Sequence, residues 1–107
     1  MVDQAVLNLA RRYMEALRSS GIHVQQGVLF GSHARGEAGP DSDIDLVVIA
    51  PEFDGSPDED LVDRLWEKRG EADWRIEPVP CGEREWETDD SRPILEIARR
   101  EGIVIAA

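Results

Sequence analysis

Two acidic residues two positions apart, Asp43 and Asp45, are the part of this sequence best suited to chemistry. They stand at the start of a nearly continuous apolar run, 44–50, which is typical of a strand buried on both faces. Because successive strand side chains alternate between faces, both carboxylates point the same way, about 7 Å apart along the strand. That spacing lets both reach a shared pair of metal ions about 3.5–4 Å apart.

A Gly-Ser pair precedes these carboxylates. Gly31 and Ser32 follow a short apolar stretch, 28–30, so the pattern is a strand that enters a Gly-Ser turn. Such a turn presents free backbone N–H groups, which suit phosphate, and serine adds a hydroxyl donor. A Gly-Ser pair alone is common and usually structural. Two carboxylates on one buried strand are costly without cations, so the combination predicts phosphoryl or nucleotidyl chemistry.

The apolar periodicity predicts the elements that must position these residues. We expect one domain over 1–107 with an α/β (α+β) fold, in which helices pack on a small mixed sheet of about four strands. The expected helices are 4–18 (with Asp3 as N-cap), 32–37, 58–70 (burying Leu61, Val62, Leu65 and Trp66) and one that Ser91 caps. The expected strands are 24–30, 44–50, 74–80 (Trp74 and Ile76 on one face) and 103–105. An acidic connector is expected over 81–90.

Composition narrows the possible partners. The net charge is −11, and the half of the chain after residue 50 carries most of it. Such a surface repels long DNA or RNA; it either suits a basic protein partner or serves only solubility. The single cysteine, Cys81, excludes an internal disulfide. With no apparent signal peptide and no apolar run long enough to span a membrane, we expect a cytoplasmic protein.

The motif residues resemble a known family. The run Gly-Ser-x-x-Arg-Gly from Gly31, followed by Ser-Asp-Ile-Asp-Leu from Ser42, is similar to the minimal nucleotidyltransferases of the DNA polymerase beta superfamily. Residues 75–80 resemble the strand that carries the family's third carboxylate, and residues 93–103 resemble the end of its short members. The resemblance therefore covers most of the chain.

This resemblance implies roles for individual residues. Gly31 and Ser32 would hold the nucleotide triphosphate, with ATP as the default. Asp43 and Asp45 would bind two Mg2+ ions, and Glu77 would be the third carboxylate, with Asp73 as the alternative. The resemblance leaves two roles open for Arg35, which either steadies the triphosphate or pairs with an acidic neighbour.

The resemblance also implies a partner. Short family members resemble antitoxins of toxin–antitoxin modules that transfer AMP from ATP to a tyrosine hydroxyl of an all-helical HEPN-type toxin. A hetero-oligomer with that partner is the expected assembly, and a homodimer is also compatible. Two alternatives remain: a nucleotide-binding or inert domain that neutralises a helical partner by contact alone, and a small-molecule transferase of the aminoglycoside-modifying type.

Overall fold

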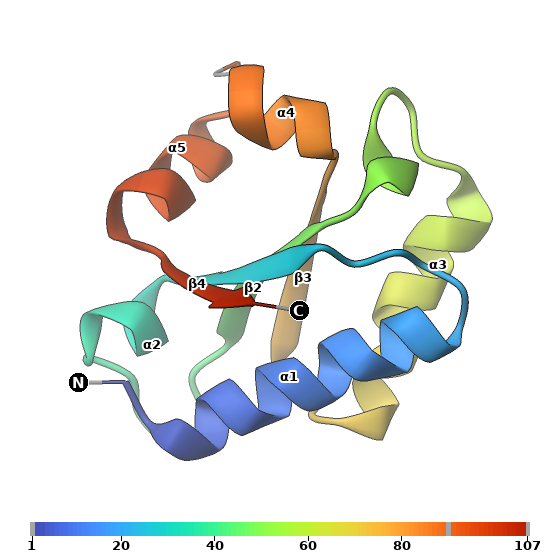
Figure 1. Ribbon diagram of the computed structural model, residues 1–107. Helices are drawn as coiled ribbons and strands as arrows, with labels where there is room; N and C mark the ends of the chain where they lie inside the picture. The colour runs from blue at the N-terminus through green and yellow to red at the C-terminus, as the bar shows by residue number, and fades with distance from the viewer. Residues whose placement is uncertain (1, 90, 107) are drawn as a thin grey trace.

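The computed structural model describes residues 2–89 and 91–106, which form one mixed four-stranded sheet with helices on both faces (Figure 1). This confirms the predicted fold class. The strand order is β3-β2-β1-β4; β2 and β3 are parallel, and β1 is antiparallel to both neighbours. No helix within these residues is long and apolar enough to cross a membrane. The strands are β1 (Gln26–Phe30), β2 (Ile44–Ile49), β3 (Ile76–Cys81) and β4 (Ile103–Ala106); the helices are α1 (Gln4–Ser19), α2 (Ser32–Arg35), α3 (Glu59–Glu67), α4 (Glu83–Thr88) and α5 (Pro93–Glu101), with short 3-10 turns η1 (Pro51–Phe53) and η2 (Lys68–Glu71).

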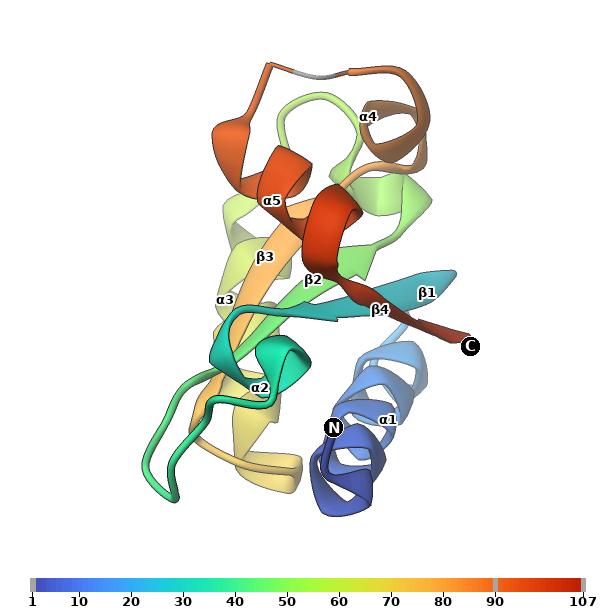
Figure 2. The ribbon, with the colours of Figure 1, turned by 90° about the vertical axis from the view of Figure 1, so that its left-hand side faces the viewer.

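Side-chain alternation along β2 divides the core into two parts. Ile44, Leu46 and Val48 belong to the core on the α1 side of the sheet, and Val47 and Ile49 to the core on the α5 side. α1 and α5 lie on opposite sides of the sheet in both ribbon views (Figures 1 and 2). The middle strand is therefore buried on both faces, as its apolar run predicted.

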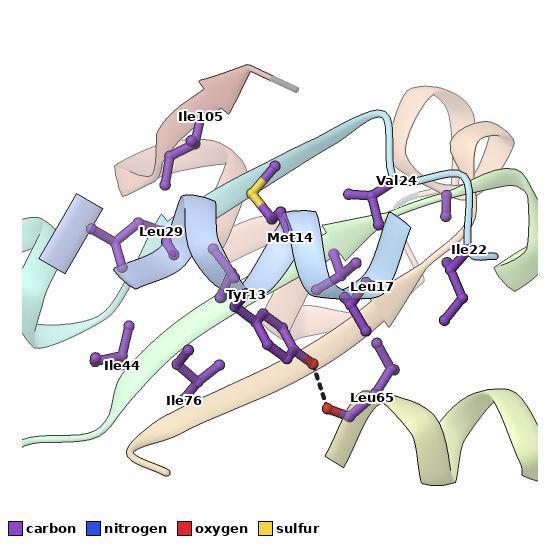
Figure 3. Close-up of a cluster of buried hydrophobic side chains, with 14 of the residues drawn as sticks. Tyr13, Met14, Leu17, Ile22, Val24, Leu29, Ile44, Leu65, Ile76 and Ile105 are labelled. Atoms are coloured by element: carbon purple, nitrogen blue, oxygen red, sulfur yellow. Dashed lines mark hydrogen bonds between the residues drawn. The ribbon is translucent and has the colours of Figure 1, made fainter. Parts of the chain in front are cut away.

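The larger core lies between the sheet and α1 (Figure 3). α1 begins where its N-cap predicts, because the Asp3 carboxylate accepts a hydrogen bond from the backbone N–H of Ala5. Tyr13 is fully buried, and its hydroxyl donates to the Leu65 carbonyl oxygen of α3 at 2.6 Å. Burial raises the pKa of Tyr13 well above its ordinary value, so the phenol remains a donor at neutral pH. This bond ties α3 to α1.

Replacing Tyr13 by phenylalanine is expected to lower the free energy of unfolding by about 1–2 kcal/mol, because the Leu65 carbonyl loses its buried donor. Equilibrium urea unfolding of the two proteins measures the difference. A change below about 0.3 kcal/mol would show that the hydroxyl contributes no net stability and that α3 is held by apolar packing alone.

α5 covers the opposite face only in part. Leu95 and Ala98 pack against Val28 and Val47 on the α5 side of the sheet. Phe30, at the end of β1, also belongs to this core. The first residues of β2 and β3 on the same face are only partly buried, so this end of the sheet remains accessible to a ligand.

β3 is one outer edge of the sheet, and little of its edge is free to pair. Pro78 and Pro80 have no backbone N–H. The carbonyl oxygen of Ile76 accepts a hydrogen bond from Arg69 at 3.5 Å, and that of Pro80 accepts one from Arg92 at 3.1 Å. Two N–H groups that would recruit another strand here are thus missing, and two carbonyl groups are occupied.

Two tryptophans differ from the sequence prediction. Helical spacing predicts Trp66 in a buried stripe, and strand alternation predicts Trp74 on one face of a strand. In the structure, Trp66 is 38% exposed and Trp74 is 65% exposed. β3 begins only at Ile76, so Trp74 lies before the strand. The guanidinium of Arg69 lies 4.6 Å from the Trp66 ring centroid and 5.4 Å from that of Trp74. Both rings therefore pack on a cation at the surface instead of entering the core. Of the four residues expected in the stripe, Leu65 is fully buried and Leu61 and Val62 are half-buried.

The segment predicted as an acidic connector contains a helix, α4. The Asp54 carboxylate accepts hydrogen bonds from the backbone N–H groups of Arg84 and Glu85, which stabilises the first turn from outside the segment. Arg99 donates to the carbonyl oxygen of Glu85 and to those of Trp86 and Asp89. Asp90, at the end of the predicted connector, lies outside the described residues.

The cap of the last helix also differs from the prediction. Arg92, not Ser91, is the residue before α5, and its side chain makes no capping bond. The backbone N–H of Ser91 donates to the Asp89 carboxylate instead, at 2.8 Å. Pro93 occupies the first turn of the helix, as expected.

Candidate active site

The three predicted carboxylates lie at the starts of two adjacent strands. Asp45 is the second residue of β2, Asp43 comes just before that strand, and Glu77 is the second residue of β3. The parallel register pairs Asp45 with Glu77. One step further along the same face, Val47 and Val79 belong to the core on the α5 side. Alternation therefore puts Asp45 and Glu77 on the α5 side, beside one another on neighbouring strands.

The turn after β1 approaches Asp45 with its bare backbone. Gly31 has φ +75°, a conformation that other residues rarely adopt. A β-carbon at Gly31 would collide with the Asp45 carboxylate oxygen Oδ2. Ser32 follows directly as the first residue of α2. Glycine at this position thus allows the Gly-Ser turn to pack directly against the acidic strand.

A cleft of about 470 Å3 opens between this turn, the start of β2 and α5. Its volume is within the range of small-molecule sites. Ile94 and Ile97 of α5, which are 39% and 47% exposed, give it an apolar wall. Glu77 lies beside the cleft and is not part of its lining. The polar lining residues are Gly31, Ser32, Arg35, Asp43, Asp45 and Glu101.

Asp45 is the carboxyl group most affected by this arrangement. Burial raises its pKa above the ordinary value, and the negative charges of Asp43 and Glu77 raise it further. The opposing effects of His33 and Arg35 are smaller. Ionised Asp45 is therefore disfavoured by its surroundings, and a cation bound between these carboxylates would relieve their repulsion.

The donor set fits magnesium as a cation shared with a substrate. Carboxylate oxygens are the protein ligands that Mg2+ prefers, and one or two of them commonly hold it together with substrate phosphates and water. Within residues 2–89 and 91–106, no three His, Cys, Asp or Glu side chains are gathered closely enough to hold a metal ion. The predicted three-carboxylate centre is therefore not a closed ligand set. Asp43 and Asp45 both line the cleft and supply the donors that such shared coordination needs.

Asp45→Asn is expected to raise the melting temperature at pH 7 by about 2–4 °C in metal-free buffer. Because the folded protein holds the Asp45 proton more tightly than the unfolded chain, stability falls as pH rises through the raised pKa. Asparagine does not ionise, so the variant does not lose this stability. Below the ordinary pKa of aspartate, where Asp45 is protonated in the wild type, the two proteins should have the same melting temperature. Differential scanning calorimetry across pH measures it, with Asp63→Asn on α3 as the control. A lower melting temperature for Asp45→Asn at pH 7 would contradict the electrostatic argument.

Arg35 pairs with two acidic neighbours. Its guanidinium lies 3.1 Å from Oε1 of Glu101 and 3.4 Å from Oε2 of Glu37. The same Glu101 oxygen accepts the backbone N–H of Gly31 at 3.1 Å. Sequence reasoning allowed an acidic partner for Arg35 but did not identify Glu101, which lies at the far end of the chain in an ordinary helical pattern.

Asp73, the alternative third carboxylate, has a different role. It accepts two hydrogen bonds from the Arg75 guanidinium, at 3.0 and 2.9 Å, and one from the Arg75 backbone N–H. The Arg75 side chain holds the pKa of Asp73 below its ordinary value. Arg75 also donates to the carbonyl oxygen of Pro40, so the pair fastens the loop before β2. These contacts leave Glu77 as the carboxylate beside Asp45.

His33, in α2, has a largely buried side chain. It is 8% exposed, and its Nε2 lies 3.3 Å from the carbonyl oxygen of Ser42. The contact connects α2 to the residue before Asp43. Sequence spacing does not show this contact, because α2 has only four residues and no apolar periodicity to mark a buried face.

Comparisons with solved structures show that other proteins share this fold. A crystal structure of a protein from Sulfolobus solfataricus, assigned as a nucleotidyltransferase, superposes with a TM-score of 0.65 at 21% identity, over 92% of this chain and 78% of that one. A toxin-antitoxin crystal structure with AMP-PNP gives a TM-score of 0.61 at 22% identity, over 88% of this chain and 69% of that one. No curated protein sequence matches this chain.

The sequence comparison gives the family. The profile of the family described as "Nucleotidyltransferase domain" matches residues 10–100, which include the Gly-Ser turn and all three candidate carboxylates. The match extends over most of the chain and agrees with the fold of the two solved structures. This protein therefore belongs to the nucleotidyltransferase domain family.

Proposed function

We propose that this chain is a magnesium-dependent nucleotidyltransferase that uses ATP as the donor of AMP. Family membership supports nucleotidyl transfer, and the placement of Asp43 and Asp45 against the Gly31 turn carries the proposal. This arrangement provides a carboxylate pair for cations and a backbone turn for phosphates on two sides of one cleft.

The proposed mechanism needs only positioning and charge neutralisation from the protein. Asp43 and Asp45 would hold Mg2+, with Glu77 beside them, and the ion would supply neutralisation of the charge that develops on the transferred phosphate. Gly31 and Ser32 would orient the triphosphate. The acceptor hydroxyl oxygen forms a bond to the α-phosphorus, the bond to the pyrophosphate oxygen breaks, and the hydroxyl proton leaves to solvent.

The proposed acceptor is a tyrosine hydroxyl on an all-helical HEPN-type toxin, for which this chain would act as antitoxin. Three observations support a protein acceptor. One of the similar folds is a toxin-antitoxin crystal structure with AMP-PNP. The net charge of −11 would attract a basic partner such as an RNA-binding toxin. The apolar wall of Ile94 and Ile97 at the cleft gives an acceptor segment a surface to contact.

Intact-mass spectrometry tests this proposal. Where the genome encodes a helical protein beside this chain, that protein is incubated with the chain, ATP and magnesium. The expected result is a mass gain of one or more AMP units on the partner. Asp43→Asn/Asp45→Asn should abolish the gain, and Asp60→Asn/Asp63→Asn, which removes the same charge from α3, should not. Failure of the wild-type chain to modify the partner would overturn protein adenylylation.

A binding antitoxin is the second candidate, favoured by the exposed apolar side chains of Ile94 and Ile97 on α5, which a partner could contact without any chemistry. In that case the chain neutralises its partner by contact, and nucleotide is not consumed. A stable complex whose toxin remains inhibited with the Asp43→Asn/Asp45→Asn variant, together with no mass gain, would establish this function instead.

A further inference from the structure

The side chain of Glu101 places a negative charge at the Gly-Ser turn. Glu101 is the last residue of α5, and its side chain is 26% exposed in the lining of the cleft. It is distant in sequence from Gly31 and Arg35, yet it contacts both. No step of the proposed mechanism uses it.

Two donors converge on one oxygen of this carboxylate. Oε1 of Glu101 accepts the Gly31 backbone N–H at 3.1 Å and the Arg35 Nη1–H at 3.1 Å. A backbone amide and a guanidinium directed at a single anionic oxygen are also the contacts that a phosphate oxygen of a nucleotide makes. The structure thus holds these two donors in an arrangement for an anion, with the protein's own carboxylate bound there.

Glu101 must oppose a triphosphate in this cleft whether or not it moves. If its side chain stays, its charge adds to those of Asp43 and Asp45 and repels the phosphates. If it leaves, its contacts with Gly31 and Arg35 are lost and must be replaced. Both possibilities weaken nucleotide binding relative to a neutral residue at this position.

The backbone next to Glu101 is closely packed. A β-carbon at Gly102 would collide with the carbonyl oxygen of Ala98 and with the Val28 side chain, so the end of α5 is packed directly against β1. Rotation of the Glu101 side chain alone would release Gly31 and Arg35 and leave this packing of α5 intact.

We infer that Glu101 is an internal competitor that occupies the position of a nucleotide phosphate oxygen and is displaced when the triphosphate binds. This inference rests on the proposed function, because it concerns the triphosphate side of the same cleft. It makes Glu101 a regulator of nucleotide affinity and not a catalytic residue.

Isothermal titration with ATP and magnesium, without an acceptor, tests the inference. Glu101→Gln keeps the shape and a hydrogen-bond acceptor but removes the charge, and we expect it to lower the Kd for ATP about fivefold. Glu96→Gln makes the same charge change on the same helix outside the cleft and should leave the Kd unchanged. In 15N-labelled wild-type protein, the Gly31 amide resonance should shift on addition of ATP.

The possible outcomes separate this inference from the proposed function. Wild-type binding with an unchanged or weaker affinity in Glu101→Gln would overturn the competitor role and leave nucleotidyl transfer intact. Equal tightening by Glu96→Gln would show a general charge effect and would also overturn it. No ATP binding by either the wild type or Glu101→Gln would overturn the inference and the proposed function together.

Discussion

Asp45→Asn is expected to lower the rate of nucleotidyl transfer by about a thousandfold, since it removes the charge that sits between Asp43, Glu77 and the Gly31 turn. Asparagine keeps the size of the side chain and one oxygen, but it cannot neutralise a divalent cation. The loss should appear in kcat, because the ion stabilises charge that develops in the transition state.

Initial-rate kinetics of partner modification test this prediction, with the release of pyrophosphate as the readout. Asp45→Asn should transfer nucleotide about a thousandfold more slowly and be more heat-stable than the wild type in metal-free buffer. Added magnesium should raise the melting temperature of the wild type only. Misfolding would instead lower activity and stability together. Transfer at a rate within tenfold of the wild type would exclude Asp45 as a metal ligand.

Gly31→Ala is expected to have the second-largest effect: a loss of about 1–3 kcal/mol in stability and about a hundredfold in activity. Alanine is strained at φ +75°, and its β-carbon would meet the Asp45 carboxylate. The turn or the carboxylate must move, so the phosphate and metal sides of the cleft lose their relative position. Urea unfolding and initial-rate kinetics measure the two losses.

Gly55→Ala is the control for this substitution. Gly55 has φ +78°, close to that of Gly31, but a β-carbon there would meet no atom within 4 Å. It therefore reports the cost of backbone strain in an open loop. If the two variants lose equal stability and Gly31→Ala remains active, the contact with Asp45 has no importance for the site.

The sequence predicted the sheet well because each strand carries a local signal. The apolar run after Asp43 is typical of a central strand, and alternation along it placed Asp45 on a defined face. Glu77 follows from the same period of two, once β3 pairs in parallel with β2. The Gly-Ser turn at Gly31 was visible because it follows an apolar stretch and precedes the two carboxylates of the next strand.

The remaining features depend on contacts between distant segments. Trp74 lies at the surface because Arg69 offers its ring a cation, which no periodicity shows. α4 is stabilised by Asp54 and Arg99, which lie on either side of it in the sequence. Glu101 reaches the turn only after α5 packs on the sheet. Each of these residues has an ordinary local pattern and acquires its role from the tertiary structure.

The two outer strands also limit how copies of this protein can associate. Growth of a sheet from molecule to molecule requires every copy to offer two edges, one for each neighbour. On β3, Pro78 and Pro80 have no N–H to offer, and the carbonyl groups of Ile76 and Pro80 are already bonded to arginines. Among the described residues, β4 is the outer strand without proline and is the better suited to strand addition. Edge-to-edge association of this fold would therefore favour a closed pair through β4 over propagation into a fibre.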